Sequence, residues 1–278
     1  MNLLTLFTFV ALLHTVQTLA KGNVLKPSLQ LATTAQISDV QQYWVSEKLD
    51  GMRAYWNGQA LFSRQGHQIN APSWYTEHWP DTSLDGELWS QRNSFESIVS
   101  CVRRKVPVDD CWQKIAFYVF DLPASKATFS QRIQRITAIS AAAKTPYLKA
   151  VKQFRVTSEP ALFALLDFIV ANGGEGLMLH HEKALYRPGR SQHLIKLKKH
   201  YDAEAVVIKH ISGKGKYQDM LGALLVRTPS GLEFKIGSGF TDQLRKHPPP
   251  IGSVITYKFI GKTARGVPRF ASFLRIRR

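Results

Sequence analysis

Basic residues are concentrated in the C-terminal part of the chain, at the place where the strand pattern also changes. The 278 residues carry a formal net charge of +17, with 37 Lys and Arg against 20 Asp and Glu. Residues 195–278 hold 17 of these basic residues and 5 of the acidic ones, a net of +12. After Tyr201, short β-rich stretches alternate with Gly, Pro and Lys turns, which predicts a small barrel or sandwich. We therefore expect a basic, all-β second unit over residues 201–278 that binds a polyanion such as nucleic acid.

The preceding part of the chain mixes strand and helix patterns. Asn57-Gly58 predicts a hairpin between two short strands. Residues 115–120 form a compact aromatic run that is typical of a buried strand. A helix is expected over residues 158–172, because Ser158 can cap its start and Gly173 can end it. This mixture predicts an α+β unit over residues 21–200.

The first twenty residues contain no Lys, Arg, Asp or Glu and include an apolar run. Small residues before Lys21 suit cleavage after Ala20, so we interpret residues 1–20 as a secretory signal peptide. An uncleaved membrane anchor is the alternative, although the run is short for a bilayer span. The expected mature protein is periplasmic or secreted, with no stable membrane association after cleavage.

The chain has two cysteines, Cys101 and Cys111. In an oxidising compartment they could form a disulfide that closes a short loop. Two free thiols are the alternative. A structural metal site is not expected here, since no second Cys or His pair stands at ligand spacing.

Residues 47–53, Glu-Lys-Leu-Asp-Gly-Met-Arg, combine three side-chain types with separate chemical uses. Lys48 can act as a covalent nucleophile once it loses its proton. Gly51 permits a close backbone approach, and Arg53 offers a planar fork of donors for phosphate or carboxylate. A surface turn at Asp50-Gly51, flanked by solvated charges, is the alternative.

Five further motifs follow this segment, and each would be weak evidence alone. In order they are Phe62-Ser63-Arg64-Gln65-Gly66, Leu84-Asp85-Gly86-Glu87-Leu88, Tyr118-Val119-Phe120-Asp121, Glu175-Gly176-Leu177-Met178 and Leu194-Ile195-Lys196-Leu197-Lys198. Together the six motifs resemble the covalent nucleotidyltransferase superfamily of DNA ligases, RNA ligases and messenger-RNA capping enzymes. Residues 43–278 most closely resemble the small bacterial ATP-dependent DNA ligases of exported type. The resemblance implies an α+β fold, with an ATP-grasp-like adenylation domain followed by a small β-barrel OB-fold domain.

The resemblance also implies roles for individual residues. Lys48 would attack the α-phosphorus of ATP and carry AMP, and Arg190 would bind the nick phosphate. Glu175 and Glu87 would hold a metal ion. The implied nucleotide-binding residues are Glu47, Arg53, Arg64, Glu87, Phe120, Lys196, Lys198 and Arg277. Arg277 best matches the last arginine of the family's terminal motif, although Ala271 stands where the family has a proline beside Phe270.

The implied activity is ATP-dependent sealing of nicked double-stranded DNA by a monomeric enzyme with Mg²⁺, or alternatively Mn²⁺. Other readings are an RNA ligase or another polynucleotide nucleotidyltransferase, and a non-catalytic basic DNA-binding protein on the same fold. Export argues against a capping enzyme, because it separates the protein from nascent transcripts. An NAD-dependent ligase is disfavoured, since no cysteine cluster for zinc is found and no nicotinamide-recognition domain is expected.

Overall fold

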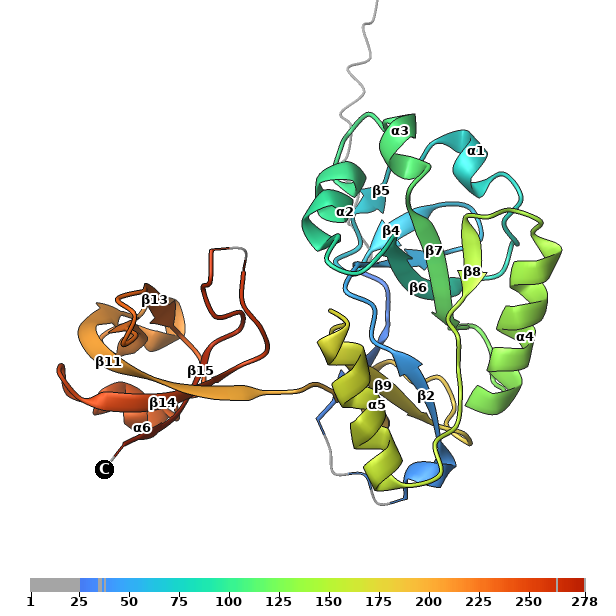
Figure 1. Ribbon diagram of the computed structural model, residues 1–278. Helices are drawn as coiled ribbons and strands as arrows, with labels where there is room; N and C mark the ends of the chain where they lie inside the picture. The colour runs from blue at the N-terminus through green and yellow to red at the C-terminus, as the bar shows by residue number, and fades with distance from the viewer. Residues whose placement is uncertain (1–25, 35–36, 38, 264, 278) are drawn as a thin grey trace, which may run out of the picture.

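The computed structural model describes residues 26–34, 37, 39–263 and 265–277. These residues form a larger and a smaller lobe, joined by the connection between strands β10 (Gly189–Leu197) and β11 (Tyr201–Ser212) (Figure 1). The predicted signal peptide and its cleavage site lie outside the described residues. The mixture of helices and sheets in the larger lobe confirms the predicted α+β class.

The larger lobe contains two sheets. The four-stranded sheet has the order β1-β10-β9-β2, and the six-stranded sheet has the order β5-β4-β3-β6-β7-β8. In addition to β10, the strands are β1 (Gln30–Thr33), β2 (Tyr43–Glu47), β3 (Met52–Trp56), β4 (Leu61–Ser63), β5 (Gln68–Ile69), β6 (Leu84–Trp89), β7 (Ala116–Asp121), β8 (Leu148–Ala150) and β9 (Leu177–His181). The chain crosses from one sheet to the other between β2 and β3, which is where the Lys48 motif lies.

Helices surround these sheets. They are η1 (Val40–Gln42), α1 (Ser73–Thr76), α2 (Phe95–Val102), α3 (Asp109–Trp112), α4 (Phe129–Ala142) and α5 (Glu159–Ala171). The expected helix over 158–172 is confirmed as α5, and its cap is formed by Ser158 Oγ accepting from Ala161 N at 3.3 Å. The Asn57-Gly58 hairpin is confirmed between β3 and β4, and the strand expected over 115–120 is β7.

Each sheet of the larger lobe has its own apolar core. The six-stranded sheet packs its aromatic and aliphatic side chains against α1, α2 and α3, with Tyr75, Trp112 and Phe117 fully buried. The four-stranded sheet packs against α5 through Leu162, Leu166 and other aliphatic residues. Each sheet is stabilised by its own core, so residues 48–51, which connect β2 to β3, are anchored at both ends.

The smaller lobe is a five-stranded sheet of order β13-β12-β11-β14-β15 with its own core. Besides β11, its elements are η2 (Gly215–Tyr217), β12 (Leu221–Arg227), β13 (Glu233–Ile236), α6 (Asp242–Lys246), β14 (Val254–Phe259) and β15 (Ser272–Ile276). The sequence predicted a β-barrel here. Among the described residues the barrel is not closed, because the edge strands β13 and β15 do not pair and only an isolated bridge joins Ser238 to Ser272.

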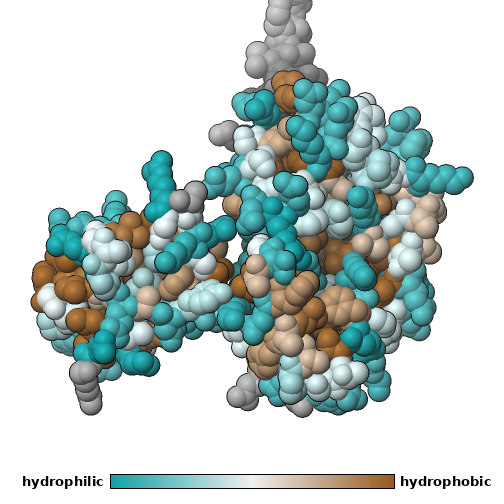
Figure 2. Space-filling model, in the orientation of Figure 1, coloured by the Kyte–Doolittle hydropathy of each residue, from teal (hydrophilic) through white to brown (hydrophobic). Residues whose placement is uncertain are grey.

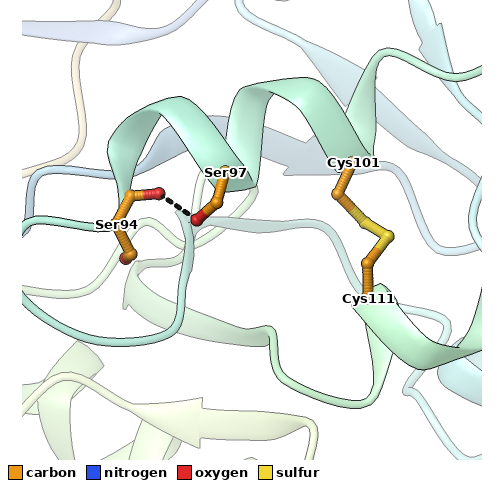
Figure 3. Close-up of a disulfide and its surroundings, with 4 residues drawn as sticks. All are labelled: Ser94, Ser97, Cys101 and Cys111. Atoms are coloured by element: carbon orange, nitrogen blue, oxygen red, sulfur yellow. Dashed lines mark hydrogen bonds between the residues drawn. A yellow bond between two sulfur atoms is a disulfide. The ribbon is translucent and has the colours of Figure 1, made fainter.

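Cys101 and Cys111 form a disulfide that joins the end of α2 to α3 (Figure 3). Of the two alternatives left open by the sequence, the structure has the disulfide and not two free thiols. Cys101 is buried in the core of the six-stranded sheet, and Cys111 packs against that core from its edge. The bond closes a loop whose basic side chains face solvent.

Hydrophilic residues cover most of the face shown in Figure 2. Hydrophobic residues gather there over α5, where Phe163 and Phe168 are exposed. In the described part of the chain, every helix is too short or too polar to cross a bilayer.

Candidate active site

A cavity of about 620 Å³ lies between the two sheets of the larger lobe. Its walls come from both sheets, from α2 and from the segment after β2. Eleven residues proposed for the site from the sequence can be checked against it. Nine of them line the cavity: Glu47, Lys48, Arg53, Arg64, Glu87, Phe120, Arg190, Lys196 and Lys198. Glu175 is not a lining residue, but it forms ion pairs with two that are, Lys48 and Lys198.

Lys48 stands at the end of β2 and is held at both its backbone and its side chain. Its amide N donates to Gly176 O at 2.9 Å, and its Nζ donates to Glu175 Oε2 at 2.6 Å. The other oxygen of Glu175 accepts from Lys198 Nζ. Gly176 has φ +148°, and a Cβ there would collide with Leu197 O, so glycine permits this close contact of strands. Two lysines therefore share one carboxylate at the cavity wall.

Arg53 is fixed by a buried carboxylate that also lines the cavity. Its Nε and Nη2 donate to Asp85 Oδ1 and Oδ2 at 2.9 and 2.6 Å, which is the bidentate geometry that favours arginine. Tyr186 OH also donates to Asp85 Oδ2, at 2.9 Å. The guanidinium carbon of Arg53 lies 5.3 Å from the ring centre of Phe120. Asp85 thus holds the guanidinium of Arg53 near the ring of Phe120, at the distance of a cation–π contact.

Two more carboxyl groups lie near Lys48 and have unusual protonation. Burial raises the pKa of Glu87 to about 8, although Lys48 and Arg53 nearby oppose the shift. Burial, followed by the charge of Glu175, also raises the pKa of Asp50. A cation bound beside these two carboxyl groups would favour their ionised form.

Glu47 lines the cavity, yet its carboxylate is engaged by another residue. Arg92 Nε and Nη2 donate to Glu47 Oε1 and Oε2 at 2.8 and 2.9 Å, and Arg92 Nη1 donates to Asn172 O at 3.0 Å. Arg92 thus ties the strand before Lys48 to the segment before Glu175. Glu47 therefore helps to hold the site together through Arg92. The sequence led us to expect that it binds the nucleotide.

Three of the basic side chains that line the cavity come from β10 and the residue just after it. Lys196 lies on β10, as does Arg190, and Lys198 follows the strand end. Burial lowers the pKa of Lys196, and Lys198, Lys48 and Arg190 add to the effect. Arg64 follows β4 and also lines the cavity. A bound phosphate would relieve the repulsion among these cations.

Arg277 is the one predicted site residue that the structure does not bring to the cavity. It lies after β15, mostly exposed, and pairs with Glu204 in the smaller lobe. Arg269 instead reaches the larger lobe, with its Nη2 3.6 Å from Asp50 Oδ2. Phe270 lies beside it, with its ring centre 5.6 Å from Lys198 Nζ.

Several residues that line or support the cavity were not identified from the sequence. Asp85 stood within a quoted motif, and its place two residues before Glu87 was a usable signal. Tyr186 stands in the family-like segment that ends with Arg190 and Ser191, but no role was expected for it. Arg92, the α2 residues Phe95 and Val99, and Arg103 after α2 gave no signal, because their contacts join segments far apart in the chain.

Comparison with known proteins agrees with this geometry. The family model described as ATP dependent DNA ligase domain matches residues 28–198, and the model described as DNA ligase OB-like domain matches residues 212–277. A DNA ligase of Haemophilus influenzae is 39% identical over 247 residues, covering 89% of this chain and 91% of that protein. A DNA ligase of Methanosphaera stadtmanae is 26% identical over 236 residues, covering 75% of this chain and 42% of that protein.

Solved structures are similar over nearly the whole chain. A structure from a structure-function study of Lig E DNA ligases has a TM-score of 0.85 and 46% identity, and it covers 90% of this chain and 98% of its own. The Chlorella virus DNA ligase-adenylate has a TM-score of 0.52 and 25% identity, with 90% of this chain and 98% of its own covered. The larger lobe is thus a nucleotidyltransferase adenylation domain and the smaller lobe an OB-fold domain. The chain belongs to the ATP-dependent DNA ligase family.

Proposed function

We propose that this protein seals nicks in duplex DNA through a lysyl-AMP intermediate on Lys48. In the first step the lone pair of Lys48 Nζ forms a bond to the α-phosphorus of ATP, the bond to pyrophosphate breaks, and the nitrogen releases a proton. In the second step an oxygen of the DNA 5′-phosphate forms a bond to the phosphorus of the AMP, the bond from that phosphorus to Lys48 Nζ breaks, and the nitrogen regains a proton. In the third step the 3′-hydroxyl attacks that 5′-phosphorus, loses its proton, and AMP leaves.

The observation that carries the proposal is the position of Lys48 beside Glu175 and Lys198. Lys48 Nζ lies 2.6 Å from Glu175 Oε2 and faces a cavity large enough for a nucleotide. Lys198 shares that carboxylate, and Lys196 lies on the same wall. Cations placed around a reacting phosphate stabilise the charge that develops during transfer.

The carboxylates near Lys48 suit a magnesium ion. Glu87 and Glu175 could supply oxygen ligands. Burial raises the pKa of Glu87 to about 8, and a bound cation would favour its ionised form. No cluster of three Asp, Glu, His or Cys side chains able to hold a metal occurs among the described residues. Phosphate oxygens and water would therefore complete the shell. When bound, the ion neutralises charge on the nucleotide phosphates.

Nicked DNA is the proposed partner, bound by the adenylation domain and the basic OB-fold domain together. The +12 charge of residues 195–278 supports strong electrostatic attraction to the phosphate backbone. We expect a monomer, and we expect affinity to fall steeply as salt concentration rises.

We further propose that the protein works outside the cytoplasm. The apolar, uncharged residues 1–20 support export, and the Cys101–Cys111 disulfide is of a kind that persists in an oxidising compartment. Fractionation of cells that express the full chain would test the proposal, and recovery of the uncleaved protein in the cytosol would contradict it.

The activity is tested by labelling the mature chain from Lys21 with α-labelled ATP, GTP or NAD. Label from ATP should stay on the protein, should disappear in Lys48→Ala and should persist in Lys126→Ala, a matched change at an exposed lysine. The labelled protein should then seal a nicked DNA duplex. Labelling from GTP, or sealing of RNA alone, would favour another polynucleotide nucleotidyltransferase. Absence of any adduct would favour a non-catalytic DNA-binding protein.

A further inference from the structure

A basic loop on the adenylation domain begins at the edge of the site described above and continues beyond it. Residues 103–108, Arg-Arg-Lys-Val-Pro-Val, connect α2 to α3 within the ring closed by the Cys101–Cys111 disulfide (Figure 3). Arg103, Arg104 and Lys105 are all exposed. We propose that this basic loop binds the phosphate backbone of the duplex beside the nick, a role that rests on the proposed function.

The three cations lack carboxylate partners. Within the part of the chain that the structure describes, none of them takes part in a salt bridge. The nearest acids along the sequence begin α3, and Asp109 Oδ1 there accepts from Trp74 Nε1 at 3.0 Å. The three adjacent positive charges repel one another, and a polyanion bound against them would offset that repulsion. DNA phosphates supply that charge.

The loop backbone is held at several points, so its side chains are presented on a fixed support. Arg103 N donates to Val99 O at 3.2 Å, and Asn70 Nδ2 donates to Lys105 O at 2.8 Å. Cys101 is buried on one side of the loop, and Trp112 is buried just beyond Cys111 on the other. A loop that is already ordered loses little conformational entropy when it binds.

The position of the loop connects it to the reacting phosphate. Arg103 lines the cavity that Lys48 faces, and Arg64 lines the same cavity. A DNA strand whose 5′-phosphate lies at Lys48 must leave the cavity across its rim. Arg104 and Lys105 follow Arg103 directly, on the solvent side. They are therefore placed to meet the next phosphates rather than the reacting one.

The test compares two double variants that each remove two positive charges. Arg104→Gln/Lys105→Gln changes the loop. The control, Lys126→Gln/Arg135→Gln, changes two exposed residues, one before α4 and one on it. Helix α4 packs on β7 and β8, away from the loop between α2 and α3. Binding of a nicked duplex is measured by fluorescence anisotropy at several salt concentrations. In the loop variant the slope of log Kd against log salt should fall by about 1.8, since each lost phosphate contact contributes about 0.9. Its Kd near physiological salt should rise roughly ten- to thirtyfold.

The control variant should keep the slope and Kd of the unaltered protein. Equal behaviour of the two variants would overturn the proposal, as would an unchanged slope in the loop variant. Arg104→Glu is a second variant at the same exposed position, and reversal of the charge should weaken binding further. Its failure to do so would count equally against the loop.

The disulfide gives a separate measurement. In Cys101→Ala/Cys111→Ala the loop loses its covalent closure, so the Kd for nicked DNA should rise several-fold while the rate of self-adenylation stays the same. An unchanged Kd would overturn the role given to loop order. Self-adenylation and nick sealing by the unaltered protein test the proposed function itself. The comparison of loop and control variants needs only DNA binding, so either conclusion can fail without the other.

Discussion

Lys48 Nζ and Glu175 Oε2 lie 2.6 Å apart, and they come from segments 127 residues apart in the chain. The pairing is reinforced by the backbone, because Lys48 N donates to Gly176 O at 2.9 Å. The side chain of the expected nucleophile is thus oriented by the segment just before β9 that carries its carboxylate partner. Loss of that carboxylate should affect reaction more than folding.

Glu175→Gln should lower the rate of self-adenylation by about a hundredfold, because a preorganised charged contact at a phosphate site is lost. The measurement is single-turnover transfer of label from α-labelled ATP. Glu182→Gln is the matched control, since Glu182 forms a partly exposed ion pair with Arg155 outside the cavity. A Glu175→Gln protein as fast as the control would refute the role of this pair.

Asp85→Asn should destabilise the fold by about 3–5 kcal/mol, because it leaves Arg53 largely buried without its counter-charge. Tyr186→Phe removes one hydrogen bond to the same carboxylate and should cost about 1 kcal/mol. Urea unfolding followed by tryptophan fluorescence gives both values. The network would be unimportant if both variants unfolded at the same urea concentration as the unaltered protein.

Glu87→Gln should change how stability depends on pH. Burial raises the pKa of Glu87 from 4.5 to about 8, so the folded state holds this proton more tightly than the unfolded state does. The resulting stability is complete below pH 4.5 and is lost as pH rises through 8. Glutamine does not titrate, so the melting temperature of the variant relative to the unaltered protein should increase between pH 6 and pH 9. A constant difference in the absence of nucleotide and metal would contradict this.

Reduction of the Cys101–Cys111 disulfide should lower the free energy of unfolding by about 3 kcal/mol, as expected for a loop closed by cysteines ten residues apart. Urea unfolding with and without reductant measures the change. The control is Cys101→Ala/Cys111→Ala, whose stability should not respond to reductant. A response in that variant would show that the reductant acts elsewhere.

Local patterns predicted much of the fold. Asn57-Gly58 predicted the β3–β4 hairpin because its turn conformation depends on those two residues. Ser158 and Gly173 predicted the limits of α5, since capping is a local interaction. The parallel pairing of β1 with β10 was not predicted, because it joins residues more than 150 positions apart. Closure of the predicted barrel also depended on contacts between distant edge strands, and those strands do not pair.

The sequence by itself determined the chemical groups of the site and their order along the chain, because six short motifs specify residue types at fixed local spacing. Only the tertiary structure decided which of those groups meet. It brings Glu175 to Lys48, commits Glu47 to Arg92, and leaves Arg277 with Glu204 away from the cavity. Spacing within a motif is set by the backbone, whereas contacts between motifs depend on how the two sheets and the two domains pack.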